Sequence, residues 1–161
     1  MHTAICPGSF DPITMGHLDI IERAASIFDR LIIAVMRNSE KRCLFTPEER
    51  VELVRASTAH VKNVSVVVSD KLLVDLCRET GAQAAVRGLR AMSDFEHEFQ
   101  MALINRRLYP DMETVFLTAR ETHQYLSSSV VKEVGALGGG ISDFVPPAAL
   151  EGILVKLKRN G

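Results

Sequence analysis

Five short apolar runs recur along the chain, and a segment with the periodicity of a helix separates each run from the next. The runs are rich in β-branched residues or alanine, and they cover about residues 3–6, 31–36, 64–68, 82–86 and 113–117. Their near-continuous apolarity is typical of strands covered on both faces. The alternation of strands and helices predicts an α/β fold built on a five-stranded parallel sheet, with helices on both faces and right-handed crossovers.

The 161 residues fit one domain, expected to span 1–161, because no linker, repeat or low-complexity tract divides them. Thr46-Pro47-Glu48-Glu49 and Ser93-Asp94-Phe95-Glu96 each predict a helix start with a capping box. Gly81 and the triplet 138–140 predict two helix ends, and a last helix is expected after Pro147.

The overall charge excludes some partners. A formal net charge of -1 provides no global attraction to nucleic acid or to an anionic membrane, so neither is expected as a partner. The apolar run at 31–36 is far shorter than the roughly 20 residues of a membrane span. Cys6, Cys43 and Cys77 are odd in number and lack metal-like spacing, which favours reduced thiols and a cytoplasmic location.

The segment from Pro7 to His17 joins the first expected strand to the first expected helix. Gly8 and Gly16 allow the backbone to approach a ligand closely, and the free amides of the first helical turn attract phosphate oxygens. His17 adds a side-chain donor at the same place. This segment therefore predicts a phosphate-binding loop.

Cations follow the later strands, at the edge where an open α/β sheet binds ligands. Arg87-Gly88-Leu89-Arg90 places two guanidinium groups beside a glycine, which suits a polyphosphate, and few acidic groups are expected near them. The cations expected at this edge are Arg37, Lys41, Arg42, Lys71, Arg87, Arg90, Arg120 and His123.

A second anion site is expected where Ser127-Ser128-Ser129 precedes a helical pattern, although a purely structural cap is an equal alternative for any one serine. No Gly-x-Ser-x-Gly turn provides a nucleophile for His17. If the acceptor is itself a phosphate, it is mostly ionised near neutral pH, and the site needs only to align the reactants and neutralise their charge. These features predict direct in-line displacement at a phosphoryl group.

The segment Pro7-Gly8-Ser9-Phe10-Asp11-Pro12 followed by Thr14-Met15-Gly16-His17 resembles the nucleotidyltransferases with a Thr/His-x-Gly-His motif. Within them the chain is similar to the bacterial phosphopantetheine adenylyltransferases, from its first strand to Pro146-Pro147. The resemblance implies a Rossmann-like domain with short C-terminal helices. It also implies transfer of the adenylyl group of ATP to 4′-phosphopantetheine, giving dephospho-coenzyme A and pyrophosphate.

The resemblance further implies the site residues. His17 would be catalytic and stabilise the transition state, and no side chain would bind metal, since Mg²⁺ would be held mainly by ATP and pyrophosphate oxygens. The residues implied for ATP are Ser9, Phe10, His17, Gly88, Leu89, Arg90, Glu98, His123, Gln124, Tyr125, Leu126, Ser127, Ser128 and Ser129. Those implied for 4′-phosphopantetheine are Ser9, Lys41, Leu73, Arg87 and Asn105.

The chain departs from the family pattern at Cys6, Lys71, His97 and the run His123-Gln124-Tyr125, where aromatic, neutral or acidic residues are usual. A homohexamer and feedback by coenzyme A are further implications of the resemblance. Two alternatives remain open: a related transferase acting on nicotinamide mononucleotide or glycerol phosphate, and a non-catalytic nucleotide-binding regulator.

Overall fold

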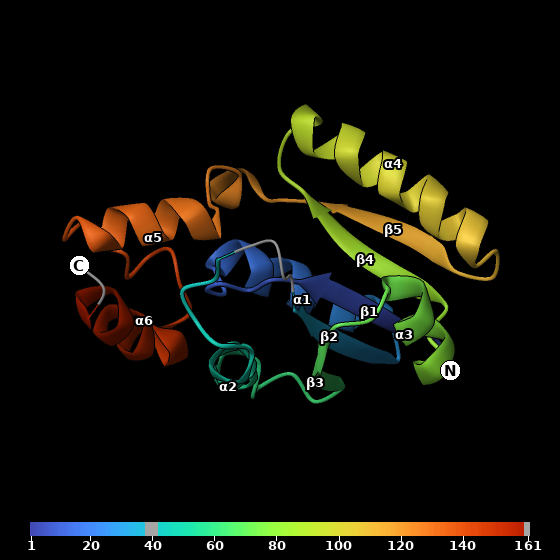
Figure 1. The fold of residues 1–161 in the computed structure, drawn as a ribbon, viewed down its shortest axis with the longest axis horizontal. Helices are drawn as coiled ribbons and strands as arrows, with labels where there is room; N and C mark the ends of the chain where they lie inside the picture. The colour runs from blue at the N-terminus through green and yellow to red at the C-terminus, as the bar shows by residue number, and fades with distance from the viewer. Residues whose placement is uncertain (38–41, 160–161) are drawn as a thin grey trace.

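A five-stranded parallel sheet forms the centre of the computed structural model, which describes residues 1–37 and 42–159 (Figure 1). The strands are β1 (Thr3–Gly8), β2 (Arg30–Met36), β3 (Val64–Ser69), β4 (Ala84–Leu89) and β5 (Glu113–Thr118). They lie in the order β3-β2-β1-β4-β5, and each neighbouring pair is parallel. The predicted sheet is confirmed, and its strand order reverses between β1 and β4.

Helices cover both faces of the sheet, as the continuous apolarity of the strands predicts. Ala4 and Cys6 of β1 belong to one core cluster, whereas Ile5 between them belongs to a second cluster on the other face. The helices are α1 (Met15–Ile27), α2 (Pro47–Ser57), α3 (Leu73–Thr80), α4 (Met92–Leu108), the 3₁₀ turn η1 (Glu121–His123), α5 (Ser128–Ala136) and α6 (Pro147–Arg159). The first cluster takes side chains from α1, α2, α5 and α6, and the second from α3. Figure 1 shows α4 lying along β4 and β5.

One predicted helix start is confirmed and one is wrong. Thr46 caps α2 in a complete capping box with Glu49. Ser93 caps nothing, because α4 already begins at Met92 without a side-chain cap. Asp94 of that sequence pattern accepts hydrogen bonds from the backbone and side chain of Arg90.

The predicted helix ends are confirmed, but the fourth strand ends later than predicted. Gly81 and Gly138 follow α3 and α5 with left-handed φ angles of 68° and 79°. Strand β4 continues to Leu89 instead of ending near residue 86, so Arg87 and Gly88 are strand residues and only Arg90 lies beyond the strand. None of the helices in the described part of the chain is both long and apolar enough to cross a bilayer.

Candidate active site

A cavity of about 650 Å³ opens beside the carboxyl ends of β1 and β4. The β1–α1 loop, the last residues of β4, the first turns of α4 and the segment from Ala119 to Lys132 line it. This is where the strand order reverses, which is the expected position for a ligand in an open α/β sheet. The cavity brings together these predicted residues: Ser9, Phe10, His17, Arg87, Gly88, Arg90, Glu98, His123, Leu126, Ser127, Ser128 and Ser129.

Other predicted residues lie outside the lining. Leu73 is the first residue of α3 and packs against the second core cluster, and Asn105 lies near the end of α4. Tyr125 is exposed, with its ring edge-on to Phe144. Leu89 and Gln124 are also absent from the lining, and Lys41 lies outside the residues that the structure describes.

His17 is held as a neutral hydrogen-bond donor at the start of α1. It occupies the third helical position, and its Nδ1 accepts the backbone N–H of Thr14 at 3.0 Å. Because Nδ1 accepts this proton, the proton of the neutral ring sits on Nε2. Burial lowers the pKa of His17 to about 4, and the charges of Arg90 and Arg87 act in the same direction.

The loop before α1 has a strained and closely packed backbone. Phe10 adopts a φ angle of 49°, a left-handed conformation that is uncommon for residues other than glycine. The residue is 3% exposed, and its ring meets the His17 ring edge-on, with 5.1 Å between centroids. A Cβ added at Gly8 would lie 3.0 Å from the Phe10 ring, so a larger residue there would require the ring to shift by a few tenths of an ångström.

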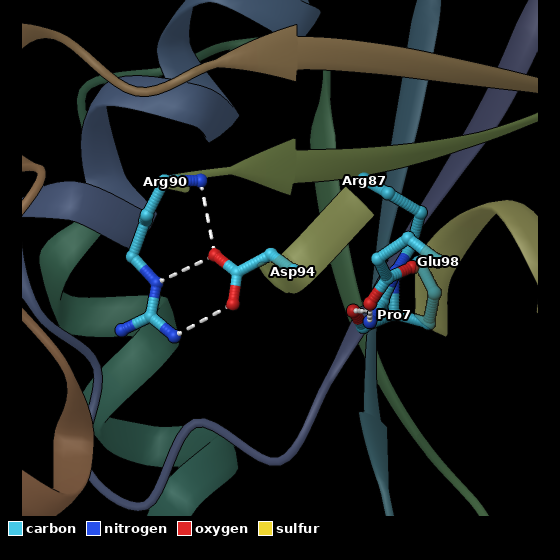
Figure 2. Close-up of polar contacts among 5 residues, drawn as sticks. All are labelled: Pro7, Arg87, Arg90, Asp94 and Glu98. Atoms are coloured by element: carbon cyan, nitrogen blue, oxygen red, sulfur yellow. Dashed lines mark hydrogen bonds and ion pairs between the residues drawn. The ribbon is translucent and has the colours of Figure 1, made fainter. Parts of the chain in front are cut away.

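Two arginines of the cavity are paired with carboxylates of α4 (Figure 2). The Nε of Arg87 donates to Glu98 at 2.7 Å, and its Nη1 donates to the Pro7 carbonyl. Arg90 binds Asp94 and donates through Nη1 to the Leu126 carbonyl at 2.8 Å. The expectation of few acidic groups here is wrong, since α4 places one carboxylate against each guanidinium.

The ion pair with Glu98 stabilises the charged form of Arg87. Burial alone lowers the pKa of Arg87, but the hydrogen bond and charge of Glu98 outweigh it and leave the pKa raised. Burial raises the pKa of Asp94, yet its bonds to Arg90 lower it overall. Both pairs therefore hold the two guanidinium groups in place before any ligand arrives.

Asp11 joins three segments of the site. Its carboxylate accepts backbone N–H groups from Leu44 and Phe45, and the Nζ of Lys132 at 2.8 Å. Burial raises the pKa of Asp11, but these three bonds reverse the shift and lower it. Asp11 is therefore a loop anchor.

The serine run at 127–129 forms the start of α5, and two of its three hydroxyls are engaged within the protein. Ser127 caps α5 by accepting the N–H of Val130, and Ser128 donates to the Pro12 carbonyl at 2.7 Å. The amino ends of α1 and α5 thus meet at one cavity, and each carries the partial positive charge of unpaired amides.

Of the other predicted cations that the structure describes, one lines the cavity and three do not. Arg42 lines the cavity, whereas Arg37, Lys71 and Arg120 lie outside its lining and pair with Glu48, Glu79 and Asp19. Lys71 is half exposed and turned to its carboxylate partner.

Thr14, Cys6 and His97 also line the cavity, and Cys6, Cys43 and Cys77 are free thiols. Across residues 1–37 and 42–159, no three His, Cys, Asp or Glu side chains gather as a metal site.

Sequence comparison identifies relatives over nearly the whole chain. A family model described as cytidylyltransferase-like matches residues 5–134. A phosphopantetheine adenylyltransferase of Heliobacterium modesticaldum is 57% identical over 93% of this chain and 89% of its own. The proteins of the same name from Caldanaerobacter subterraneus and Rubrobacter xylanophilus are 49% and 53% identical, covering 99% and 94% of this chain and 100% and 92% of theirs.

Solved structures share the fold at lower identity. A structure described as a nicotinate-nucleotide adenylyltransferase of Vibrio parahaemolyticus superposes with a TM-score of 0.74 at 20% identity, covering 100% of this chain and 98% of its own. A bifunctional NMN adenylyltransferase/ADP ribose pyrophosphatase of Francisella tularensis, complexed with AMP and a manganese ion, gives 0.70 at 13% identity, covering 99% and 48%. These two matches establish the Rossmann-like architecture.

Proposed function

The chain belongs to the phosphopantetheine adenylyltransferases, and we propose that the cavity at the carboxyl ends of β1 and β4 is where it carries out their reaction. It transfers the adenylyl group of ATP to 4′-phosphopantetheine and releases pyrophosphate, forming dephospho-coenzyme A. One observation carries the assignment of the site: the neutral His17 donor stands at the start of α1, in a cavity that α5, Arg87 and Arg90 also border.

His17 is the catalytic group in this proposal. Its Nε2–H donates to an oxygen of the α-phosphoryl group, where negative charge increases as the acceptor phosphate attacks. The Thr14 amide fixes the ring in that tautomer before substrate binds. The acceptor needs no general base, because its phosphate is already ionised. The new P–O bond forms to the phosphopantetheine phosphate as the bond to pyrophosphate breaks.

The nucleotide is assigned to the side of the cavity nearest α5. Arg90 and the amides at the start of α5 neutralise the β- and γ-phosphates, and Ser9 and Phe10 lie between the nucleotide and the acceptor. Leu89, Gln124 and Tyr125, which lie outside the lining, are assigned to the edge of the adenosine site. The other residues assigned to ATP are Gly88, Glu98, His123, Leu126, Ser127, Ser128 and Ser129.

The acceptor phosphate is assigned to Arg87, together with Lys41. Glu98 occupies the Nε and Nη2 side of Arg87, so the phosphate would approach the remaining face of the guanidinium or displace the carboxylate. Leu73 and Asn105 are assigned to the far end of the pantetheine arm, beyond the cavity lining.

Magnesium fits this site as a substrate-bound ion. Asp11, Asp94 and Glu98 are each engaged by a cation, so they offer no free carboxylate set for a metal. When bound through ATP and pyrophosphate oxygens, Mg²⁺ would supply charge neutralisation on the leaving group.

Acceptors used by other members of the superfamily are less well supported. The relatives at 49–57% identity carry the phosphopantetheine adenylyltransferase name, whereas the nucleotide adenylyltransferase structures are only 13–20% identical. Nicotinamide mononucleotide and glycerol phosphate should therefore be poor acceptors. A non-catalytic regulator would not need the preoriented His17 donor.

Assembly, feedback and location are further parts of the proposal. Helix α4 has no buried residue and exposes Met92, Phe99, Met101, Leu103, Ile104 and Leu108, which supports burial of this helix against copies of the chain in a homohexamer. Coenzyme A shares the phosphopantetheine moiety and would compete for the same cavity. The three free thiols support a cytoplasmic location.

The function is tested with purified protein, ATP, 4′-phosphopantetheine and magnesium. We expect pyrophosphate and dephospho-coenzyme A in equal amounts, and no pyrophosphate when the acceptor is omitted. Nicotinamide mononucleotide and glycerol phosphate are offered in parallel reactions. A clear preference for either one, or no product with any acceptor, would refute the proposal.

A further inference from the structure

Arg50 is a buried cation directly behind the phosphate-binding loop. It lies on α2 and is only 2% exposed, on the same helix face as Val54 and Ser57. No carboxylate of the described residues lies within ion-pair distance of its guanidinium, and its Nε has no hydrogen-bond partner. Buried charges are normally paired, so this arrangement calls for an explanation.

Two backbone carbonyls hold the guanidinium. Its Nη1 donates to the carbonyl of Ser9 at 2.6 Å and to that of Met36, the last residue of β2, at 3.1 Å. The Ser9 carbonyl directly precedes Phe10, whose φ angle of 49° gives the loop its left-handed turn. Arg50 thereby ties the strained turn to the end of the neighbouring strand.

We infer that Arg50 is a positioning residue for adenylyl transfer, which fixes the Ser9–Phe10 turn and places an unneutralised positive charge behind the phosphate-binding loop. The inference rests on the proposed function. Ser9 lines the cavity, and the Phe10 ring contacts the His17 ring, so a shift of this turn changes where the donors stand around the α-phosphoryl group. The same charge acts mainly on the transition state, in which negative charge increases on the α-phosphoryl group, and so affects kcat more than KM.

The test replaces Arg50 with Ala and measures kcat, KM and thermal stability. We expect kcat to fall by about 10- to 100-fold, because small displacements of catalytic groups carry losses of this size. KM for ATP should change by less than about threefold, since Arg90 and α5 provide most of the ground-state contacts in the proposed site. A purely structural role would lower the melting temperature and leave kcat of the folded protein unchanged.

Arg55→Ala is the matched control. Arg55 lies on the same helix, but it is half exposed and pairs with Glu52. We expect its kcat to equal that of the wild type. Guanidinium ion at millimolar concentration should restore part of the kcat of Arg50→Ala by entering the vacated site, and it should restore nothing in His17→Ala.

Arg50→Lys decides the question if Arg50→Ala does not fold, because lysine keeps the charge and most of the volume. Its ammonium lacks the planar fork of arginine, so we expect kcat to fall at least about fivefold. A folded Arg50 variant with wild-type kcat would overturn the inference while leaving the proposed function intact. A wild-type protein without turnover would refute the proposed function, and this inference with it.

Discussion

His17 shows how a local backbone contact sets the chemistry of a side chain. The Thr14 amide determines which ring nitrogen carries the proton, and burial near two arginines keeps the ring neutral. The imidazole is therefore a donor at neutral pH without carrying a charge. The Thr-x-Gly-His spacing predicted a donor at this place, but not its tautomer.

Removing the imidazole should impair turnover more than folding. We expect His17→Ala to lower kcat by about 10² to 10³, the usual loss for one transition-state donor. His60→Ala is the control, since His60 is exposed, pairs with Glu22 and lies outside the cavity lining. Steady-state kinetics on both variants measure the difference. A kcat within threefold of wild type for His17→Ala would show that another group performs this role.

The low pKa of His17 predicts an acid-dependent loss of stability. The ordinary pKa is 6.5 and the folded value is about 4, so between these values the unfolded chain binds a proton that the folded chain does not. The free energy of unfolding should therefore be unaffected by this residue above about pH 6.5 and fall as the pH is lowered toward 4.

Urea titrations at pH 7.5, 6 and 5 measure this effect, with His17→Ala as the comparison. The variant lacks the titrating group, so we expect a smaller decline in its free energy of unfolding over this range. An identical decline in both proteins would contradict the assignment of a neutral, buried His17.

Two ion pairs of the site, Asp11–Lys132 and Arg87–Glu98, could not be predicted from local patterns, because neither has the i,i+3 or i,i+4 spacing of neighbours on a helix. Asp11 and Lys132 are 121 residues apart, and only the folded sheet brings them within 2.8 Å. Glu98 was a predicted nucleotide contact, yet its partner is Arg87. The unusual position of Arg50 could have been noticed in the sequence, since a charged residue on the same helix face as Val54 interrupts the apolar pattern of that face.

At the scale of elements, the helix ends and four of the strands follow from the sequence, because glycine and periodic apolar residues act locally. The start of α4 does not, because Asp94 is engaged by Arg90 and Ser93 is left without a capping role. Strand β4 also extends through Arg87 and Gly88, since pairing with β5 continues to Leu89. At β4 the contact with another strand overrides the local pattern, whereas at the start of α4 the competing contact is the nearby Arg90–Asp94 pair, four residues apart.

The two similar capping patterns should respond differently to the same substitution. Thr46→Ala removes the hydroxyl that accepts the Glu49 amide, and we expect a loss of about 1 kcal/mol in the free energy of unfolding. Ser93→Ala should change it by less than about 0.5 kcal/mol, because Ser93 is an exposed residue without a cap. Urea denaturation of both variants checks this, and equal losses would contradict the boundaries of α4.

At the scale of the molecule, the sheet was predictable because its strands are covered on both faces, but the assembly was not. The residues that distinguish α4 are apolar and exposed, and the sequence alone does not separate an exposed apolar helix from a buried one. The proposed homohexamer assigns these residues to contacts between copies.

Sedimentation tests that assembly. We expect the wild type to sediment as a hexamer and Ile104→Glu to give smaller species, because a charge in an apolar interface is costly. Val155→Glu is the matched control, since Val155 of α6 is 44% exposed and Ile104 of α4 is 45% exposed. A hexamer that persists with Ile104→Glu would exclude this face of α4 as a major contact.

The central claim is that this site aligns the acceptor phosphate with the α-phosphate of ATP and stabilises the transition state of a direct displacement, without a protein nucleophile. The stereochemistry at the α-phosphorus tests it most directly, using ATP made chiral at that atom with sulfur. A single in-line displacement predicts inverted configuration in the dephospho-coenzyme A product. Retained configuration would require two displacements through a covalent adenylyl-protein, and it would contradict the account.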